Sequence, residues 1–136
     1  MASSRRVAVT TFASNVARIK AVAHAARAAD REVVVVGRAM ERVVQVARET
    51  GYLDGVQNFR SMEMYGHFPA DKVLALCTGS QGEPRAALAR IANNDHPQVT
   101  LNKGDRVIFS SRTIPGNEKA VGSIINGLVT QGVEVV

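Results

Sequence analysis

Two segments rich in glycine, serine and threonine contain the residue types in this sequence that could do chemistry. They read CTGSQGEP, from Cys77 to Pro84, and SSRTIPGNE, from Ser110 to Glu118. Each follows an apolar run and precedes a helical pattern, so that backbone N–H groups and the positive end of a helix dipole can face an anion. These residues are therefore suited to binding a phosphate or another anion. Taken singly, either segment can also be a purely structural turn.

The two segments lack the motifs of nucleotide cofactors. Neither contains the Gly-Lys-Ser/Thr ending of a phosphate-binding P-loop, and neither has the three glycines of a dinucleotide fingerprint. Acidic residues that could act as an acid and a base each have a capping or turn explanation as well. These residues are Glu83, Asp95, Asp105 and Glu118. The spacing of residues alone therefore assigns no catalytic residue.

A metal centre and a nucleophilic cysteine are also not predicted within this chain. The three histidines, His24, His67 and His96, are scattered, and there is no His-x-His-x-Asp-His cluster and no cysteine pair. The single cysteine, Cys77, ends the apolar run VLAL without a neighbouring histidine. Such a cysteine is better explained as a small buried side chain than as a nucleophile.

The elements that must position the two segments follow from the apolar pattern. Short β-branched or apolar runs begin at Val7, Glu32, Lys72, Arg106 and Val133, and longer helical patterns lie between them. Four consecutive valines at positions 33–36 show no polar alternation, which is typical of a strand that helices cover on both faces. The sequence thus predicts a doubly wound α/β fold with a mostly parallel five-stranded sheet and helices on both faces. Because ligands bind at the carboxyl ends of parallel strands, the two segments are expected to face one crevice.

The helices have recognisable ends. Ser14 or Asn15 is a good N-cap for a first helix, whose apolar residues recur at spacings of three and four. A second helix is predicted from about Met40 to Thr50, with Gly51 at the position of a left-handed C-cap. The segment from Tyr52 to Asp71 has no sustained period and is predicted to be a loop with short irregular turns.

Composition and charge narrow the class of protein. A chain of 136 residues suits one domain, and the excess of 17 Lys and Arg over 12 Asp and Glu attracts polyanions, nucleic acid first. The alternative explanation of this basic excess is that the arginines lie on solvated helix faces and bind no polyanion. With no run of about 18 apolar residues and no apolar region after the first arginines, the chain is expected to be cytoplasmic.

Four motifs together resemble one protein family over nearly the whole chain. They are TTFASNVARI, GRAMERVVQVARETGYL, LCTGSQGEPRAALARIANNDH and GDRVIFSSRTIPGNE, and they resemble the β-CASP domain of ribonuclease J-type metallo-β-lactamase nucleases. The resemblance implies a bacterial RNA processing and decay enzyme with 5′-to-3′ exonuclease and endonuclease activity. Hydrolysis would depend on two zinc ions in a metallo-β-lactamase domain that this sequence lacks, so the segment alone is expected to be inactive and to hold no cofactor.

The resemblance also implies partners and a domain layout. RNA would run between this domain and the metallo-β-lactamase domain of the same parent chain, which would be a homo-oligomer without membrane contact. Residues 1–6 are expected to be a linker or a remnant of cloning, and residues 7–136 the β-CASP domain. The acidic residue that related RNA-cleaving enzymes carry as motif A has no counterpart between Thr10 and Ala29, and its position stays unassigned.

The residues that match the family's motifs are expected to line an RNA channel and to position the strand. They are Ser14, Asn15, Arg18, Arg38, Thr78, Gly79, Ser80, Gln81, Gly82, Glu83, Ser110, Ser111, Gly116, Asn117 and Glu118, with Gly37, Met40 and Pro115 beside them. No catalytic residue and no metal ligand is expected among them.

Two other functions are compatible with the same residues. The first is a free-standing flavodoxin-like module whose two anion-binding loops hold a nucleotide or a phosphorylated small molecule. The second is an assembly surface formed by the aromatic and methionine side chains between Tyr52 and Asp71. Core packing beneath a loop would explain those side chains equally.

Overall fold

A six-stranded parallel sheet forms the centre of the computed structural model, which describes residues 5–12, 14–79, 81–83 and 86–136. The strand order is β3-β2-β4-β1-β5-β6, and every pair of neighbours is parallel. The strands are β1 (Val7–Thr10), β2 (Glu32–Val36), β3 (Arg60–Ser61), β4 (Val73–Cys77), β5 (Arg106–Phe109) and β6 (Glu134–Val135). The predicted fold class is confirmed, with β3 as a strand beyond the five expected.

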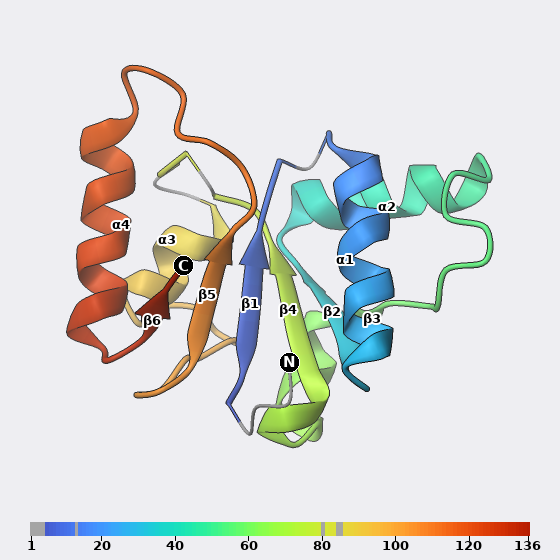
Figure 1. Ribbon diagram of the computed structural model, residues 1–136, viewed down its shortest axis with the longest axis horizontal. Coiled ribbons are helices and arrows are strands. Elements are labelled where there is room, and N and C mark those ends of the chain that lie inside the picture. The colour runs from blue at the N-terminus through green and yellow to red at the C-terminus, as the bar shows by residue number, and fades with distance from the viewer. Residues whose placement is uncertain (1–4, 13, 80, 84–85) are drawn as a thin grey trace.

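Helices flank this sheet on both faces (Figure 1). They are α1 (Val16–Ala28), α2 (Arg38–Glu49), α3 (Ala87–Ala92) and α4 (Glu118–Thr130), and two 3-10 helices, η1 (Met62–His67) and η2 (Ala70–Lys72), precede β4. Helices α1 and α2 pack on one face of the sheet, and α3 and α4 pack on the other. The sheet is therefore doubly wound, as the valine run predicts.

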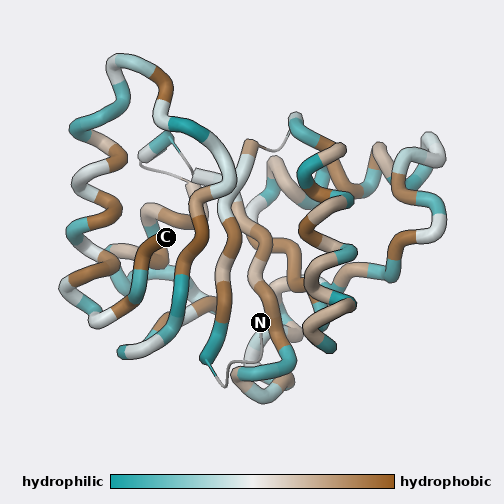
Figure 2. The backbone as a smooth tube through the Cα atoms, in the orientation of Figure 1, coloured by the Kyte–Doolittle hydropathy of each residue, from teal (hydrophilic) through white to brown (hydrophobic). Residues whose placement is uncertain are grey.

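Burial of β4 on both faces explains why its sequence is apolar throughout. Leu74 and Leu76 point into the core under α1 and α2, whereas Ala75 and Cys77 point into the core under α3 and α4. All five residues of the strand are buried. In Figure 2 the same strand is among the most hydrophobic parts of the backbone. A strand buried on both faces has no position for a polar residue, and this explains the absence of alternation.

The helix ends follow the predicted capping chemistry. The Asn15 side chain accepts a hydrogen bond of 3.0 Å from the Arg18 backbone N–H and so caps α1. Helix α2 begins two residues earlier than predicted, directly after Gly37, and ends at Glu49. Gly51 then takes a positive φ of 86°, the conformation expected of a left-handed C-cap.

The segment from Tyr52 to Asp71 is more ordered than a plain loop. It contains β3, η1 and the first two residues of η2. Tyr65 is buried, and its hydroxyl donates a hydrogen bond of 3.1 Å to the Thr100 carbonyl. Arg48 of α2 donates to the carbonyls of Leu53 and Val56, each at 2.8 Å. For Tyr65 the core-packing explanation holds, whereas the side chain of Tyr52 is 69% exposed.

A buried arginine joins three segments at the amino ends of the strands. The side chain of Arg31 is 2% exposed. Its Nη1 donates to the carbonyls of Ala70 (3.1 Å) and Val73 (2.7 Å), and its Nη2 donates to the carbonyl of Arg5 (3.0 Å). Arg5 and Arg6, at the end of the predicted linker, thus already contact the folded domain; the Arg6 backbone N–H also donates to Asp105 at 3.0 Å.

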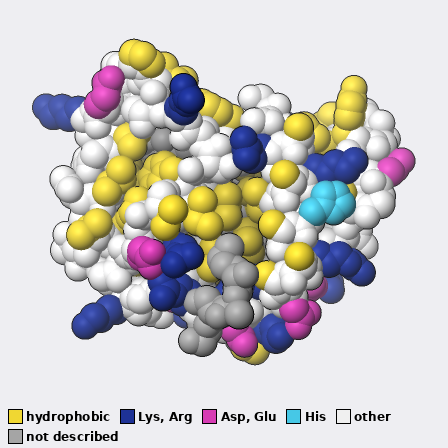
Figure 3. Space-filling view, viewed as in Figure 1, with side chains coloured by type: hydrophobic (Ala, Val, Ile, Leu, Met, Phe, Trp, Pro, Cys, Tyr) yellow, Lys and Arg dark blue, Asp and Glu magenta, His cyan; other side chains and the backbone are white. Residues whose placement is uncertain are grey.

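One part of the sheet lacks a helix over it among the described residues. On the face that carries α1, hydrophobic side chains gather in a hollow between α4 and α1, over β1 and β5 (Figure 3). Ile108 of β5 packs at the margin of the core beneath α1 and is only partly buried. Val136, which follows β6, is 61% exposed. Parallel sheets are normally covered on both faces, so this face is incompletely covered.

Candidate nucleic-acid interface

The predicted site residues follow four neighbouring strands whose carboxyl ends lie level with one another. Thr10 at the end of β1 pairs with both Cys77 of β4 and Phe109 of β5. Val36 at the end of β2 pairs with Cys77 as well. The loops that continue from these strands therefore start side by side at one edge of the sheet, as predicted. In Figure 1 this is the upper edge.

A pocket of about 670 Å³ opens between the ends of β1, β2 and β4. Four of the predicted channel residues line it, namely Arg38, Thr78, Gly79 and Glu83. Sequence reasoning missed other members of its wall, namely Thr11, Phe12, Met62, Arg90 and His96. Met62 and His96 come from segments far from both glycine-rich motifs, so no local pattern pointed to them.

Two of the residues that line this pocket are glycines with close neighbours. Gly37 has a φ of +106° and Gly79 a φ of +108°, which L side chains rarely adopt. A Cβ atom on Gly79 would lie 2.9 Å from the Leu88 Cβ, and one on Gly37 would lie 2.9 Å from the Thr78 Oγ1. The Leu88 backbone N–H donates to the Thr78 carbonyl at 3.1 Å, which ties the loop to α3.

Gln81 connects the two glycine-rich segments directly. Its Nε2 donates to the Arg112 carbonyl at 2.8 Å. Its Oε1 accepts from the Ile114 backbone N–H at 2.7 Å and from the Asn117 Nδ2 at 3.3 Å. The residue is 8% exposed. Its side chain thus holds the loop after β4 against the loop after β5 and is occupied by these contacts.

We expect Gln81→Leu to loosen this connection. The change leaves the Arg112 carbonyl and the Ile114 N–H without their side-chain partner, which costs about 1–3 kcal/mol of unfolding free energy. Amide hydrogen exchange should become faster over residues 112–117. Gln81→Glu keeps the acceptor and loses the donor, so an intermediate effect is expected. Gln45→Leu, on the exposed face of α2, is the control; equal effects of Q81L and Q45L would contradict this role.

The remaining predicted residues differ in how freely they can reach a ligand. Ser14 and Arg18 are exposed at the start of α1, whereas the Asn15 side chain is used as its cap. Ser110 and Ser111 are half-buried after β5. Gly82 packs against α4 and is buried. Gly116, Asn117, Glu118 and Pro115 form the turn and first residues of α4, where the Glu118 carboxylate accepts from the Gly116 N–H at 2.9 Å.

One residue predicted near the channel is buried in the core, and another lies outside the described part of the chain. Met40, expected beside the channel, is wholly buried in the core between α2 and the sheet, because it lies on the inner face of α2. The expectation that it approaches RNA is therefore wrong. Ser80 lies outside the described residues.

His96 is fixed in one tautomer by the backbone. Its Nδ1 accepts from the N–H groups of Gln98 (3.2 Å) and Val99 (3.1 Å). The proton of the neutral ring is therefore on Nε2. Burial, and secondly the charge of Arg90, lowers the pKa of His96 from its usual value. At neutral pH the ring is a neutral hydrogen-bond donor on the wall of the pocket.

This lowered pKa predicts a loss of stability in mild acid. The unfolded chain binds a proton at His96 at a higher pH than the folded chain does, so unfolding becomes easier as pH falls below about 6.5. We expect the urea midpoint to decrease between pH 7.5 and pH 5.5, and the decrease to be smaller in His96→Gln. His24→Gln, exposed on α1, is the control. An unchanged pH dependence in H96Q would contradict the assignment.

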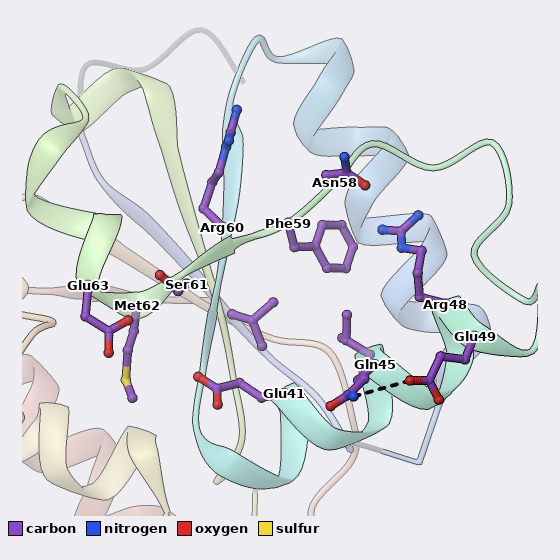
Figure 4. A pocket seen from close by; sticks show the side chains of 12 residues that line it. Glu41, Gln45, Arg48, Glu49, Asn58, Phe59, Arg60, Ser61, Met62 and Glu63 are labelled. Atoms are coloured by element: carbon purple, nitrogen blue, oxygen red, sulfur yellow. Dashed lines mark hydrogen bonds between the residues drawn. The ribbon is translucent and has the colours of Figure 1, made fainter.

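A second pocket, of about 700 Å³, lies beside the outermost strand β3, between this strand and α2. Figure 4 shows Phe59 and Arg48 on one side of it and Glu41, Gln45 and Glu49 of α2 on the other. Its acidic residues, Glu41, Glu49 and Glu63, outnumber its basic residues, Arg48 and Arg60. A polyanion is therefore disfavoured there, and the pocket beside β4 is the better candidate.

The described residues offer no metal centre and no reactive thiol. Among them, no group of three or more His, Cys, Asp or Glu side chains could hold a metal ion. Cys77 is fully buried, and burial raises its thiol pKa to about 12, as expected of a packing residue. No helix in the described ranges is long and apolar enough to cross a membrane.

Comparison with known proteins identifies the family. A family model described as "Ribonuclease J, beta-CASP domain" matches residues 4–128. "Ribonuclease J" of Sinorhizobium meliloti is 54% identical over 131 residues, covering 96% of this chain and 23% of the relative. "Ribonuclease J" of Synechocystis is 44% identical over 96% of this chain and 21% of the relative, and "Ribonuclease J2" of Bacillus subtilis is 38% identical over 98% and 24%.

The chain thus spans between a fifth and a quarter of the length of these relatives. The matched region contains α1, α2, α3, all but the last two residues of α4, and the strands up to β5, with the loops that follow β1, β2, β4 and β5. The four motifs, the doubly wound sheet and the family match therefore agree, and the chain belongs to the ribonuclease J β-CASP domain family.

Proposed function

We propose that this chain positions RNA in an enzyme that processes and degrades RNA by 5′-to-3′ exonucleolytic and endonucleolytic hydrolysis of phosphodiester bonds. The observation that carries the proposal is the carboxyl edge of the sheet, where four loops start level and the loops after β1, β2 and β4 line a pocket with Arg38 and Arg90 in its wall. Basic side chains and helix N-termini at such an edge favour phosphate groups. The names of the relatives support RNA as the substrate.

In the parent enzyme, another domain would carry out the hydrolysis and this chain would hold the RNA. Two zinc ions in a metallo-β-lactamase domain of the parent enzyme would activate water and stabilise charge on the phosphate. The residues of this chain neutralise phosphates and fix the path of the strand, a task that requires no acid or base. The isolated chain is therefore expected to bind RNA without cleaving it.

The test is RNA binding by the isolated chain as a function of salt. Fluorescence anisotropy with a labelled ten-nucleotide single-stranded RNA should show weak binding. The logarithm of the association constant should fall with the logarithm of salt concentration, with a slope of about −0.7 for each phosphate contacted. No cleavage is expected with or without added zinc, and cleavage should appear when the metallo-β-lactamase domain is joined to the chain. Binding that does not depend on salt would contradict the proposal.

The family match over residues 4–128 favours RNA positioning over the alternative of a free-standing flavodoxin-like module. Calorimetry with nucleotides and with RNA distinguishes these two functions. A nucleotide that bound at micromolar affinity, in a chain that bound no RNA, would favour the small-molecule module.

The incompletely covered face of the sheet is the surface that we propose for contact with the metallo-β-lactamase domain of the parent. Val136→Arg places a charge where the side chain is 61% exposed, so the isolated chain should keep its stability. The joined enzyme should lose thermal stability. Val129→Arg, at 57% exposure on α4, is the matched control. An equal effect of V136R and V129R in the joined enzyme would contradict this contact. Self-association of the parent, which we also propose, would be measured by sedimentation.

A further inference from the structure

The pocket beside β3 takes no part in the RNA positioning proposed above, yet its floor is apolar. Val35 of β2 and Val44 of α2 line it. Phe59 and Met62, from the irregular segment that follows α2, line it as well. Val44 and Phe59 pack at the margin of the core beneath α2 and remain partly exposed. An apolar surface with a polar rim is typical of a site that contacts another molecule.

The rim of this pocket is acidic. Glu41, Gln45 and Glu49 recur every four residues along α2 and all line the pocket, a spacing that places them on one side of the helix. Figure 4 shows Glu63 beside Met62, across the space from Glu49. The three carboxylate side chains are exposed, and within the described part of the chain they form no ion pair.

The basic side chains in the same wall are already engaged within the chain. Arg48 donates to three backbone carbonyls between residues 53 and 57, at 2.8–2.9 Å. The Nε of Arg60 pairs with the Glu32 carboxylate at 3.0 Å. The carboxylates are therefore the charged groups of this wall that can meet a partner.

The sign of the charge in this pocket is opposite to that of the chain as a whole. The chain has a formal net charge of +5, whereas acidic residues outnumber basic residues in the wall. Such a local reversal attracts a cationic partner and disfavours both nucleic acid and an anionic membrane surface. A partner is therefore expected to be positively charged where it meets α2.

The shape of the pocket favours a segment of polypeptide over a compact cation. From Glu41 to Glu49 the α2 wall extends about 12 Å along the helix axis, a length that about four residues of an extended chain span. The apolar floor suits a hydrophobic side chain, which a small polyamine lacks. β3 is only two residues long, so side chains and not strand pairing would provide recognition.

We propose that the pocket beside β3 is a docking site for a basic segment of a partner protein. An apolar side chain of this segment packs against Val44 and Phe59. Lysine or arginine side chains on either side of it pair with Glu41, Glu49 and Glu63. This surface lies outside the loops that are proposed to hold RNA, and it gives the chain a second binding function.

The test is fluorescence anisotropy with a labelled peptide in which two leucines are flanked on each side by two lysines. Glu49→Gln combined with Glu63→Gln removes two charges and should lower the affinity about tenfold, or about threefold for each exposed ion pair. Asp71→Asn with Asp95→Asn removes the same charge from exposed positions outside the pocket, and should change the affinity less than about twofold. Met62 stays unchanged, because it also lines the pocket beside β4.

A second peptide tests the apolar floor without any change to the protein. Serines replace both leucines and the lysines are kept, so the affinity should fall at least about tenfold, because no apolar side chain is buried. In ¹⁵N NMR spectra, the leucine peptide should shift the amide signals of residues 41–49 and 58–63. It should leave the signals of Thr78 and Gly79 in place.

Four results would overturn this inference. Equal affinities of the two peptides would refute the apolar contact, and equal affinities of the two double variants would refute the acidic rim. Spermidine that displaces the leucine peptide at an equal concentration would identify a site for small polyamines. Signals of residues 41–49 that shift with protein concentration alone would mean that a second copy of the chain occupies the pocket. Both double variants should bind RNA equally, so a failure here leaves the proposed function unaffected.

Discussion

Replacing Arg31 by methionine is expected to lower the free energy of unfolding by about 3–5 kcal/mol, because three carbonyl groups lose the hydrogen bonds of a buried, charged donor. The guanidinium reaches the carbonyls of Arg5, Ala70 and Val73 at once, at 2.7–3.1 Å. Burial lowers its pKa, and the charge of Asp71 partly opposes this, but the group stays protonated. Methionine fills a similar volume without a donor. Urea denaturation followed by circular dichroism measures the loss.

Lysine at the same position provides a graded comparison. Its ammonium is a compact donor without the planar fork of arginine, so Arg31→Lys should lose less than Arg31→Met but still a measurable amount. Arg27→Met, on the exposed surface of α1, should change the free energy of unfolding by less than about 0.5 kcal/mol. If R31M and R27M were equally stable, water would be satisfying the three carbonyls, and the structural role of Arg31 would be refuted.

Gly82→Ala is also expected to cause a large loss of stability. Gly82 has a φ of +78°, and a Cβ atom there would lie 2.6 Å from the carbonyl carbon of Ala120 and 2.8 Å from the backbone nitrogen of Val121. These are backbone atoms of α4, so the helix itself must move. Left-handed strain of about 1–2 kcal/mol adds to an overpacking cost of about 1–3 kcal/mol. Thermal unfolding should show a clear decrease in Tm.

Gly116→Ala separates the two contributions. Gly116 has a φ of +100°, but no heavy atom lies within 4 Å of the position of a Cβ. The change therefore introduces backbone strain without a steric clash. The difference between G82A and G116A measures the contact of the loop with α4. Equal losses would mean that α4 shifts freely and that the loop is not fixed against it.

Much of the fold could be predicted because the sheet is buried on both faces. A run such as the valines at 33–36 has a single physical explanation, and Asn15 and Gly51 mark helix ends by their own chemistry. Strand β3 could not be predicted, because its two residues, Arg60 and Ser61, are exposed and form no apolar pattern. Its strand conformation comes from pairing with β2.

The candidate site could be predicted only in part, because the role of each side chain is set by contacts with distant segments. Motifs locate loops, and the parallel sheet brings those loops together, but the use of each side chain depends on tertiary contacts. Gln81 resembles a ligand-binding residue in the sequence and is a bridge between loops in the structure. Arg90 and His96 resemble ordinary helix-end residues and line the pocket. No local spacing distinguishes these roles.

The two outermost strands have a consequence for the behaviour of the chain in concentrated solution. β3 and β6 are two residues long, and each includes a charged side chain paired to its neighbouring strand, Arg60 with Glu32 and Glu134 with Arg106. A short, charged edge offers little template for a strand of another molecule, whereas a long apolar edge promotes aggregation. The described sheet is thereby protected against edge-to-edge growth into fibrils.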